Sequence, residues 1–110
     1  MKSTKTFNEM CNFVHELLTS LGYTYKLHSN LMEYYLGEYN LFKIYNDDIG
    51  RSIWHRVSFD SVLFKVVPDE NDEYDEYEIN GIKNYATKFV KDYKQKSVDR
   101  RKKDLEKDFQ

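Results

Sequence analysis

The first segment of the chain has the pattern of an amphipathic helix. From Thr6 to Leu21, hydrophobic residues recur every three or four positions and polar residues fall on the other side. That interval is typical of one buried helical face. Gly22 follows directly, and glycine readily takes the left-handed conformation that ends a helix. The predicted buried face consists of Phe7, Met10, Cys11, Phe13, Val14, Leu17, Leu18 and Leu21.

The next stretch changes to a period of two, which indicates β-strands. Residues 23–28 alternate Tyr, Tyr and Leu against polar residues, and Ser29-Asn30 can turn the chain. Residues 31–36 and 39–46 read as two strands around Gly37-Glu38. Glycine in the first position of a two-residue turn suits a type II′ hairpin. One bent strand with a bulge at Gly37 is the alternative.

A further pair of hydrophobic runs follows the loop at residues 46–50. In residues 51–59 the side chains of Ile53, His55, Val57 and Phe59 share one face, which we expect to be the core face. In residues 62–67 the hydrophobic positions fall on the opposite parity. A turn or bulge at Asp60-Ser61 explains that switch, and Pro68 ends the run.

The last hydrophobic pattern is again helical and contains Ile82, Ala86, Phe89, Val90 and Tyr93, with Asn80 as a plausible N-cap. The sequence therefore predicts an α+β fold: an N-terminal helix, an antiparallel sheet of four or five strands, and a long C-terminal helix. Residues 1–95 form the predicted single domain. Residues 96–110 are then a charged helical extension or a frayed tail.

The composition fits one small domain that needs no disulfide or structural metal to fold. The chain has 110 residues, and ten Tyr and seven Phe carry much of its buried area. Cys11 is the single cysteine, so no intramolecular disulfide can form. The sequence shows neither the hydrophobic run of a signal peptide nor a membrane-length hydrophobic stretch. We therefore expect a cytoplasmic protein that does not engage a membrane.

The residues that could carry catalysis do not form a recognisable motif. Cys11 and His15 lie four apart, but a zinc site needs further ligands, and His28 and His55 have no matching spacing. Cys11 also belongs to the hydrophobic helix face, so a buried thiol explains it. The glycines stand far apart, so no phosphate-binding loop can be built from them. We expect no enzymatic activity, no metal and no cofactor.

Charge is strongly segregated along the chain. Residues 1–68 balance seven basic against seven acidic side chains, residues 69–87 have a net charge of −6, and residues 88–110 have a net charge of +4. Crowding like charges costs a compact domain stability, so the acidic run is either a solvated segment or a surface for a cationic partner. The predicted partner-binding residues are Asp69, Glu70, Asp72, Glu73, Tyr74, Asp75, Glu76, Tyr77 and Glu78. The run is either an exposed loop or the acidic entry to the last helix.

Two further residues are candidates for the same interface. If His55 faces the core, then Trp54 and Arg56 share the outer face of the sheet, where both residue types are common interface hot spots. Trp54 packed under the C-terminal helix is the alternative.

These features together favour a small non-enzymatic protein–protein interaction factor. In size, in Tyr content and in its clustered carboxylates the chain resembles the inhibitors encoded by phages and mobile elements, such as uracil-DNA glycosylase inhibitors and anti-CRISPR proteins. The resemblance is limited to these general features: no motif matches and no stretch aligns, so it assigns no role to any residue. It implies a partner with a basic groove, such as a nucleic-acid-acting enzyme, whose binding surface the acidic segment would occlude.

The basic tail supports an alternative, a nucleic-acid-binding accessory protein. Its phosphate-contacting residues would be Lys94, Lys96, Arg100, Arg101, Lys102 and Lys103. Acidic residues interrupt this run at i, i+4 spacing, which is typical of an ordinary solvated helix. A homodimer through the sparse hydrophobic positions Val98, Leu105 and Phe109 is also compatible with the pattern.

Overall fold

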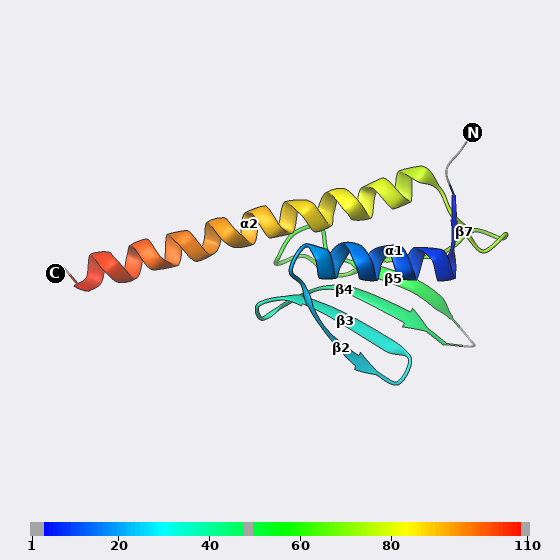
Figure 1. The fold of residues 1–110 in the computed structure, drawn as a ribbon, viewed down its shortest axis with the longest axis horizontal. Helices are drawn as coiled ribbons and strands as arrows, with labels where there is room; N and C mark the ends of the chain where they lie inside the picture. Colours follow the sequence, from blue (N-terminus) through cyan, green and yellow to red (C-terminus); the bar gives the residue numbers. More distant parts are fainter. Residues whose placement is uncertain (1–3, 48–49, 109–110) are drawn as a thin grey trace.

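A computed structural model describes the backbone of residues 4–47 and 50–108 and the side chains of residues 4–47 and 50–96. It has one helix near each end of an antiparallel sheet (Figure 1), which confirms the predicted α+β class. The elements are β1 (Lys5–Thr6), α1 (Phe7–Ser20), β2 (Thr24–His28), β3 (Leu31–Leu36), β4 (Tyr39–Asn46), β5 (Arg51–His55), β6 (Phe64–Val66), β7 (Glu73–Tyr74) and α2 (Glu76–Asp108).

Helix α1 begins and ends where its sequence predicts. The hydroxyl of Thr6 accepts a hydrogen bond from the Glu9 N–H at 3.3 Å, and the Glu9 carboxylate accepts one from the Thr6 N–H at 3.0 Å. This capping box satisfies two donors at the helix start. The bond from the Thr6 backbone is also the main cause that lowers the pKa of Glu9. Gly22 follows the helix with a φ of +98°, as expected for a residue that ends it.

Five strands form the main sheet in the order β2-β3-β4-β5-β6, and every neighbouring pair is antiparallel. Strands β3 and β4 are separate and pair Leu36 with Tyr39, so the alternative of one bent strand is wrong. Of the two turn residues between them, Gly37 has a φ of +59° and Glu38 has no positive φ. That combination is the φ pattern of the expected type II′ turn.

The change of parity after Phe59 comes from a turn, as expected. The Ser61 N–H donates to the Ser58 carbonyl, and the Ser61 hydroxyl accepts hydrogen bonds from the N–H groups of Val57 and Ser58. The flanking strands are shorter than the hydrophobic runs: β5 ends at His55, and β6 spans only Phe64–Val66.

The molecule has two layers, with α1 and α2 on the same face of the sheet (Figure 1). The core lies between these layers, and Phe42, Ile53 and Phe89 are almost completely buried in it. The Tyr23 hydroxyl donates to the Ala86 carbonyl at 2.9 Å and so ties the start of the sheet to α2.

The opposite face of the sheet is polar. Across it, Lys26, Glu33, Lys43, Trp54 and Lys65 are successive cross-strand neighbours. Both edge strands therefore have a lysine at their centre. Lys26 lies over the Tyr35 ring at 5.2 Å and Lys65 over the Trp54 ring at 5.7 Å.

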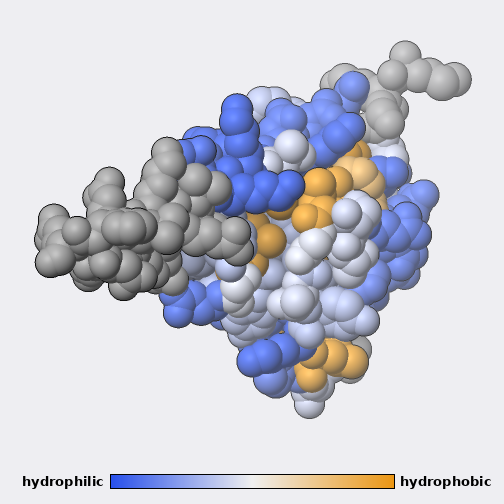
Figure 2. All heavy atoms as spheres, turned by 60° about the vertical axis from the view of Figure 1, so that its left-hand side comes forward, coloured by the Kyte–Doolittle hydropathy of each residue, from blue (hydrophilic) through white to orange (hydrophobic). Residues whose placement is uncertain are grey.

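Strand β2 differs from its prediction. Its pattern predicted a half-buried strand, but all five of its residues are exposed, including Tyr25 and Leu27 with exposed fractions of 50% and 68%. The reason is its place at the edge of the sheet, where a strand has a neighbour on one side only. Figure 2 shows a small hydrophobic patch at the lower tip of the molecule, the height at which Figure 1 places the turn between β2 and β3.

Within the part of the chain that the structure describes, neither helix combines the length and the apolar character needed to cross a bilayer.

Candidate partner-binding surface

The acidic segment, residues 69–78, is folded onto the body of the protein. Strand β7 pairs with β1, so that Tyr74 lies opposite Lys5 and Glu73 opposite Thr6. Tyr74 is fully buried and its hydroxyl donates to the Val66 carbonyl at 3.2 Å. Its role is therefore structural: it anchors the segment in the core and is not accessible to a partner.

The first part of the segment is a turn that its own aspartates stabilise. The Asp69 carboxylate accepts hydrogen bonds from the N–H groups of Asn71 and Glu73, both at 2.9 Å. Asp72 has a φ of +61° and its carboxylate lies 3.5 Å from the Arg51 guanidinium. These two acids have partners inside the chain.

The second part of the segment starts α2, and this corrects the predicted N-cap. The helix begins at Glu76, so Asn80 lies inside it and cannot be its N-cap. Instead, the Asp75 carboxylate accepts a hydrogen bond from the Glu78 N–H at 2.8 Å, and the Glu78 carboxylate accepts one from the Asp75 N–H at 3.1 Å. This is again a reciprocal capping box. Partial burial is the main cause that raises the pKa of Glu78, and the bond from the Asp75 backbone opposes it.

The remaining carboxylates of the segment, Glu70, Glu73 and Glu76, have no hydrogen-bond or ion-pair partner among the side chains that are described. Glu70 and Glu76 are exposed, and Tyr77 beside them has an exposed fraction of 86%. The ordered backbone therefore presents unpaired negative charge and one aromatic ring to solvent at this end of the molecule.

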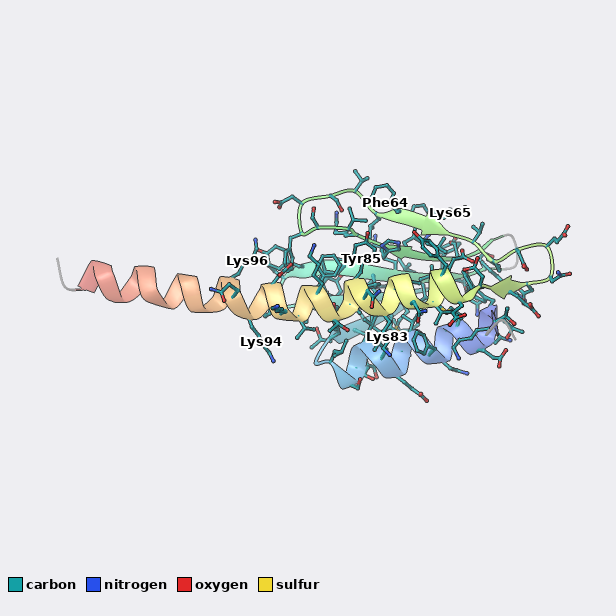
Figure 3. All side chains as sticks on the ribbon, turned by 90° about the horizontal axis from the view of Figure 1, so that it is seen from above. Phe64, Lys65, Lys83, Tyr85, Lys94 and Lys96 are labelled. Carbon is teal, nitrogen blue, oxygen red and sulfur yellow. The ribbon has the colours of Figure 1, made fainter. Side chains whose placement is uncertain are left out.

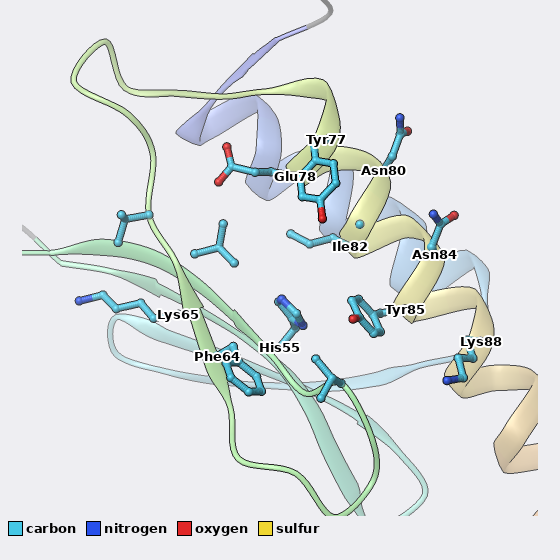
Figure 4. Close-up of a pocket in the computed structure, with 14 residues that line it drawn as sticks. His55, Phe64, Lys65, Tyr77, Glu78, Asn80, Ile82, Asn84, Tyr85 and Lys88 are labelled. Carbon is cyan, nitrogen blue, oxygen red and sulfur yellow. The ribbon is translucent and has the colours of Figure 1, made fainter.

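A groove continues this acidic surface along the body. It lies between β6 and α2 and has a volume of about 820 Å³. Figure 4 shows Tyr77 and Glu78 at one end, Lys88 at the other, and His55, Ile82 and Tyr85 between them. Two of the predicted partner-binding residues, Tyr77 and Glu78, thus line this groove.

Aromatic rings form the wall of the groove. The His55 and Tyr85 rings stack with centroids 5.1 Å apart, and Phe64 from β6 lies 6.4 Å from His55. His55 therefore faces the core side of the sheet, as its strand parity predicted. In Figure 3, Tyr85 points from α2 toward the strand that carries Phe64, whereas Lys83 lies on the other side of the helix.

Trp54 and Arg56, the other predicted partner residues, lie away from this groove. Trp54 is on the outer sheet face, where its indole N–H donates to the Ser52 hydroxyl at 2.9 Å, so the alternative under the C-terminal helix is wrong. Arg56 donates to the Asn40 carbonyl at 2.8 Å and also to the Ser61 carbonyl. It holds the loop after β5 against the β3–β4 hairpin, which explains its presence without a partner.

Of the predicted nucleic-acid residues, the structure describes the side chains of Lys94 and Lys96. Lys94 and Lys96 project from opposite sides of α2 (Figure 3). Lys96 lies over the rings of Phe59 and Tyr39, at 4.8 and 5.4 Å, so its charge is already engaged in cation–π contacts. The remaining side chains of that prediction, Arg100, Arg101, Lys102 and Lys103, lie outside the described residues, as do those of Val98, Leu105 and Phe109.

Cys11 and His15 lie beside a second hollow of about 430 Å³, between α1 and the β2–β3 end of the sheet. His15 hydrogen-bonds the Tyr34 hydroxyl through Nδ1 at 2.8 Å. Burial raises the pKa of the Cys11 thiol to about 11, so the thiol is protonated at neutral pH. A protonated thiol is a poor nucleophile and a poor metal ligand.

The three histidines do not converge. His15 binds Tyr34, His28 lies 3.1 Å from Glu33, and His55 stacks on Tyr85. Among residues 4–47 and 50–96, no three His, Cys, Asp or Glu side chains gather where they could hold a metal ion.

The chain matches no family model, no curated protein and no solved structure.

Sequence reasoning missed most of the groove. Tyr77 and Glu78 were predicted from the acidic run, but Phe64, Tyr85 and Gly81 were not singled out. The parity of residues 62–67 was a usable signal for Phe64, since it placed that ring on one face with Val62 and Val66. No pattern in the sequence indicated that β6 and α2 lie on the two sides of one groove.

Proposed function

We propose that this chain is a non-enzymatic binding module that docks through its acidic end on a basic surface of another protein. The observation that carries the proposal is the set Glu70, Glu73 and Glu76, whose carboxylates have no cation beside them among the described side chains. Like charges held on an ordered backbone repel one another, and a partner's lysines and arginines would relieve that repulsion.

Basic surfaces that hold nucleic acid are the partner class we favour. Such surfaces are built to accept closely spaced phosphate charge, and a dense row of carboxylates competes for the same cations. A chain that occupied one would act as an inhibitor of a nucleic-acid-acting enzyme. That is the role of the phage and mobile-element proteins that it resembles in character.

The fold indicates which acids can be changed without damaging it. Asp69, Asp72, Asp75 and Glu78 stabilise the turn and the helix start, so reversing them would disturb folding as well as binding. Glu70 and Glu76 are exposed, and neither has an ion-pair or hydrogen-bond partner among the side chains of residues 4–47 and 50–96. The test variant is therefore E70K/E76K. Its matched control is E16K/D60K, which changes the net charge equally at two exposed positions elsewhere.

The experiment is capture on immobilised protein from an extract of the cell that encodes the chain, at low and at high salt. We expect wild type and E16K/D60K to retain the same basic proteins, and added duplex DNA to release them. E70K/E76K should retain none of them at any salt concentration, while its circular dichroism melt stays close to that of the control.

Equal capture by E70K/E76K and wild type would refute the proposal, as would equal loss in both variants. Retention of purified, protein-free DNA or RNA by the immobilised chain, with an affinity that falls steeply as salt is raised, would favour the basic α2 segment instead.

A further inference from the structure

The groove between β6 and α2 contains a glycine that the fold itself does not require. Gly81 lies in the second turn of α2 and lines the groove. Its φ is not in the left-handed region, and a Cβ added there would meet no atom within 4 Å. Alanine would therefore fit, and it is the better helix former because glycine loses more backbone entropy on folding. Glycine at this position keeps space open beside the helix.

Exposed hydrophobic surface surrounds that space. Phe64, Val67 and Tyr77 have exposed fractions of 47%, 51% and 86%, and all three line the groove. Large hydrophobic side chains gathered at the rim of one hollow are typical of a binding surface. The aromatic pair His55 and Tyr85 lies between them and gives an apolar side chain a flat surface to contact.

The two ends of the groove differ in charge. Glu78 lies at the end nearest the acidic segment, and one oxygen of its carboxylate is taken by the Asp75 N–H. Lys88 lies at the far end. Charge complementarity therefore favours an occupant that places a basic group at the Glu78 end of the groove and an acidic or neutral group at the Lys88 end.

The length of the groove fits a short peptide. From Tyr77 to Lys88 the helix advances about 16 Å at 1.5 Å per residue. An extended chain covers that distance with about five residues. A close backbone approach at Gly81 would then place alternate side chains against the aromatic wall.

We propose that this groove binds a short extended segment of the partner protein, in which an arginine or lysine lies beside an apolar side chain. The basic group contacts Glu78, the apolar side chain packs against His55, Phe64 and Tyr85, and the peptide backbone passes over Gly81. The inference rests on the proposed function and names the part of the partner that enters the groove.

The test uses the full chain and an array of acetylated seven-residue peptides in which the positions of one arginine and one phenylalanine are varied. Binding of the best peptides is then measured by fluorescence anisotropy. Gly81→Leu fills the space, and we expect it to weaken binding about tenfold or more, the range that overpacking produces. Gly81→Ala should raise the urea midpoint of unfolding and still weaken binding.

The matched control is Thr87→Leu, which adds the same side chain at an exposed position of α2 outside the groove. We expect it to bind the peptides as wild type does. Replacing arginine by citrulline in the peptide should weaken binding to wild type but not to Glu78→Gln, because the charge contact is already absent there.

The proposal is overturned if no peptide distinguishes wild type from Gly81→Leu, or if Thr87→Leu weakens binding equally. It is also overturned if Gly81→Leu abolishes a concentration-dependent self-association in sedimentation, which would assign the groove to a second copy. The peptides occupy the groove and do not contact Glu70 or Glu76. The variant E70K/E76K can therefore lose capture of the partner protein and still bind the peptides. The two proposals are thus tested separately.

Discussion

Gly37 shows how one residue joins two distant parts of the chain. Its φ of +59° forms the turn between β3 and β4, and a Cβ placed there would collide with the Tyr93 hydroxyl and lie 3.0 Å from Cζ of that ring. Tyr93 belongs to α2 and packs edge-on against Tyr39 at 6.3 Å. The turn and the helix therefore touch at Gly37, where an added side chain would require the Tyr93 ring to shift.

Gly37→Ala is expected to destabilise the protein by about 1–2 kcal/mol from the left-handed backbone alone, with a further cost from the collision. Urea unfolding measures this loss. Tyr93→Phe removes the nearest colliding atom, so the alanine substitution should be less harmful in that background, with a coupling of about 0.5 kcal/mol or more. Strictly additive effects of the two substitutions would show that the contact does not form.

For single residues, the sequence predicts the local backbone conformation better than it predicts the tertiary contacts of the side chain. Gly22 and Gly37 could be assigned to turns because their neighbours ended one hydrophobic pattern and began another. The burial of Tyr74 could not be predicted, because a tyrosine among seven carboxylates has the local surroundings of a surface residue. Its position depends on the pairing of β7 with β1, which joins segments that are far apart in the sequence.

The start of α2 is the clearest case at the scale of elements. The sequence offers several N-cap candidates, and the hydrophobic rhythm from Ile82 favoured Asn80 as the nearest one. The pattern Asp75-x-x-Glu78, followed by Ile79, was a stronger signal, because only that pair can cap reciprocally. The helix therefore begins earlier and absorbs the end of the acidic segment.

Asp75→Ala should cost about 1 kcal/mol of stability, since it leaves the Glu78 N–H without its side-chain acceptor. Asn80→Ala, at an exposed position inside the helix, should leave stability unchanged or raise it slightly. Thermal unfolding followed by circular dichroism compares the two. The reverse order of stabilities would mean that the helix begins at the later residue.

The antiparallel sheet and its four or five strands were predictable because turn residues separate the hydrophobic runs. Its exposure was not, since the alternation in β2 looks the same in a central strand and in an edge strand. Only the order β2-β3-β4-β5-β6 decides which strands lie at the edges of the sheet, and the alternation within one strand does not give that order.

For the whole molecule, the main feature is the polarity of charge along α2. Seven acids precede or begin the helix, and nine basic residues follow from Lys88 onward. The acidic run could be read from the sequence directly. The groove beside it could not, because it is formed by elements that fold together only in three dimensions.

The partial burial of Glu78 makes the stability of the fold depend on pH. Its folded-state pKa is raised, so the ionised form is disfavoured in the folded protein at neutral pH, and this penalty disappears as pH falls through the folded pKa. Glu78→Gln keeps an acceptor for the Asp75 N–H and carries no charge. We expect it to be more stable than wild type at neutral pH, with the difference vanishing in acid. Urea unfolding across a pH series measures it, and a difference that grows toward low pH would contradict the assignment.

The lysine at the centre of each edge strand limits what the sheet can join. A second copy that aligned its β2 or β6 antiparallel with the same strand would set two ammonium groups opposite each other, in a position where like charges destabilise pairing. Each ammonium group also lies over an aromatic ring of the neighbouring inner strand, Tyr35 for Lys26 and Trp54 for Lys65. Lys26 and Lys65 therefore disfavour edge-to-edge pairing between copies of the chain, and we expect acetylation of both lysines to weaken that effect at both edges of the sheet.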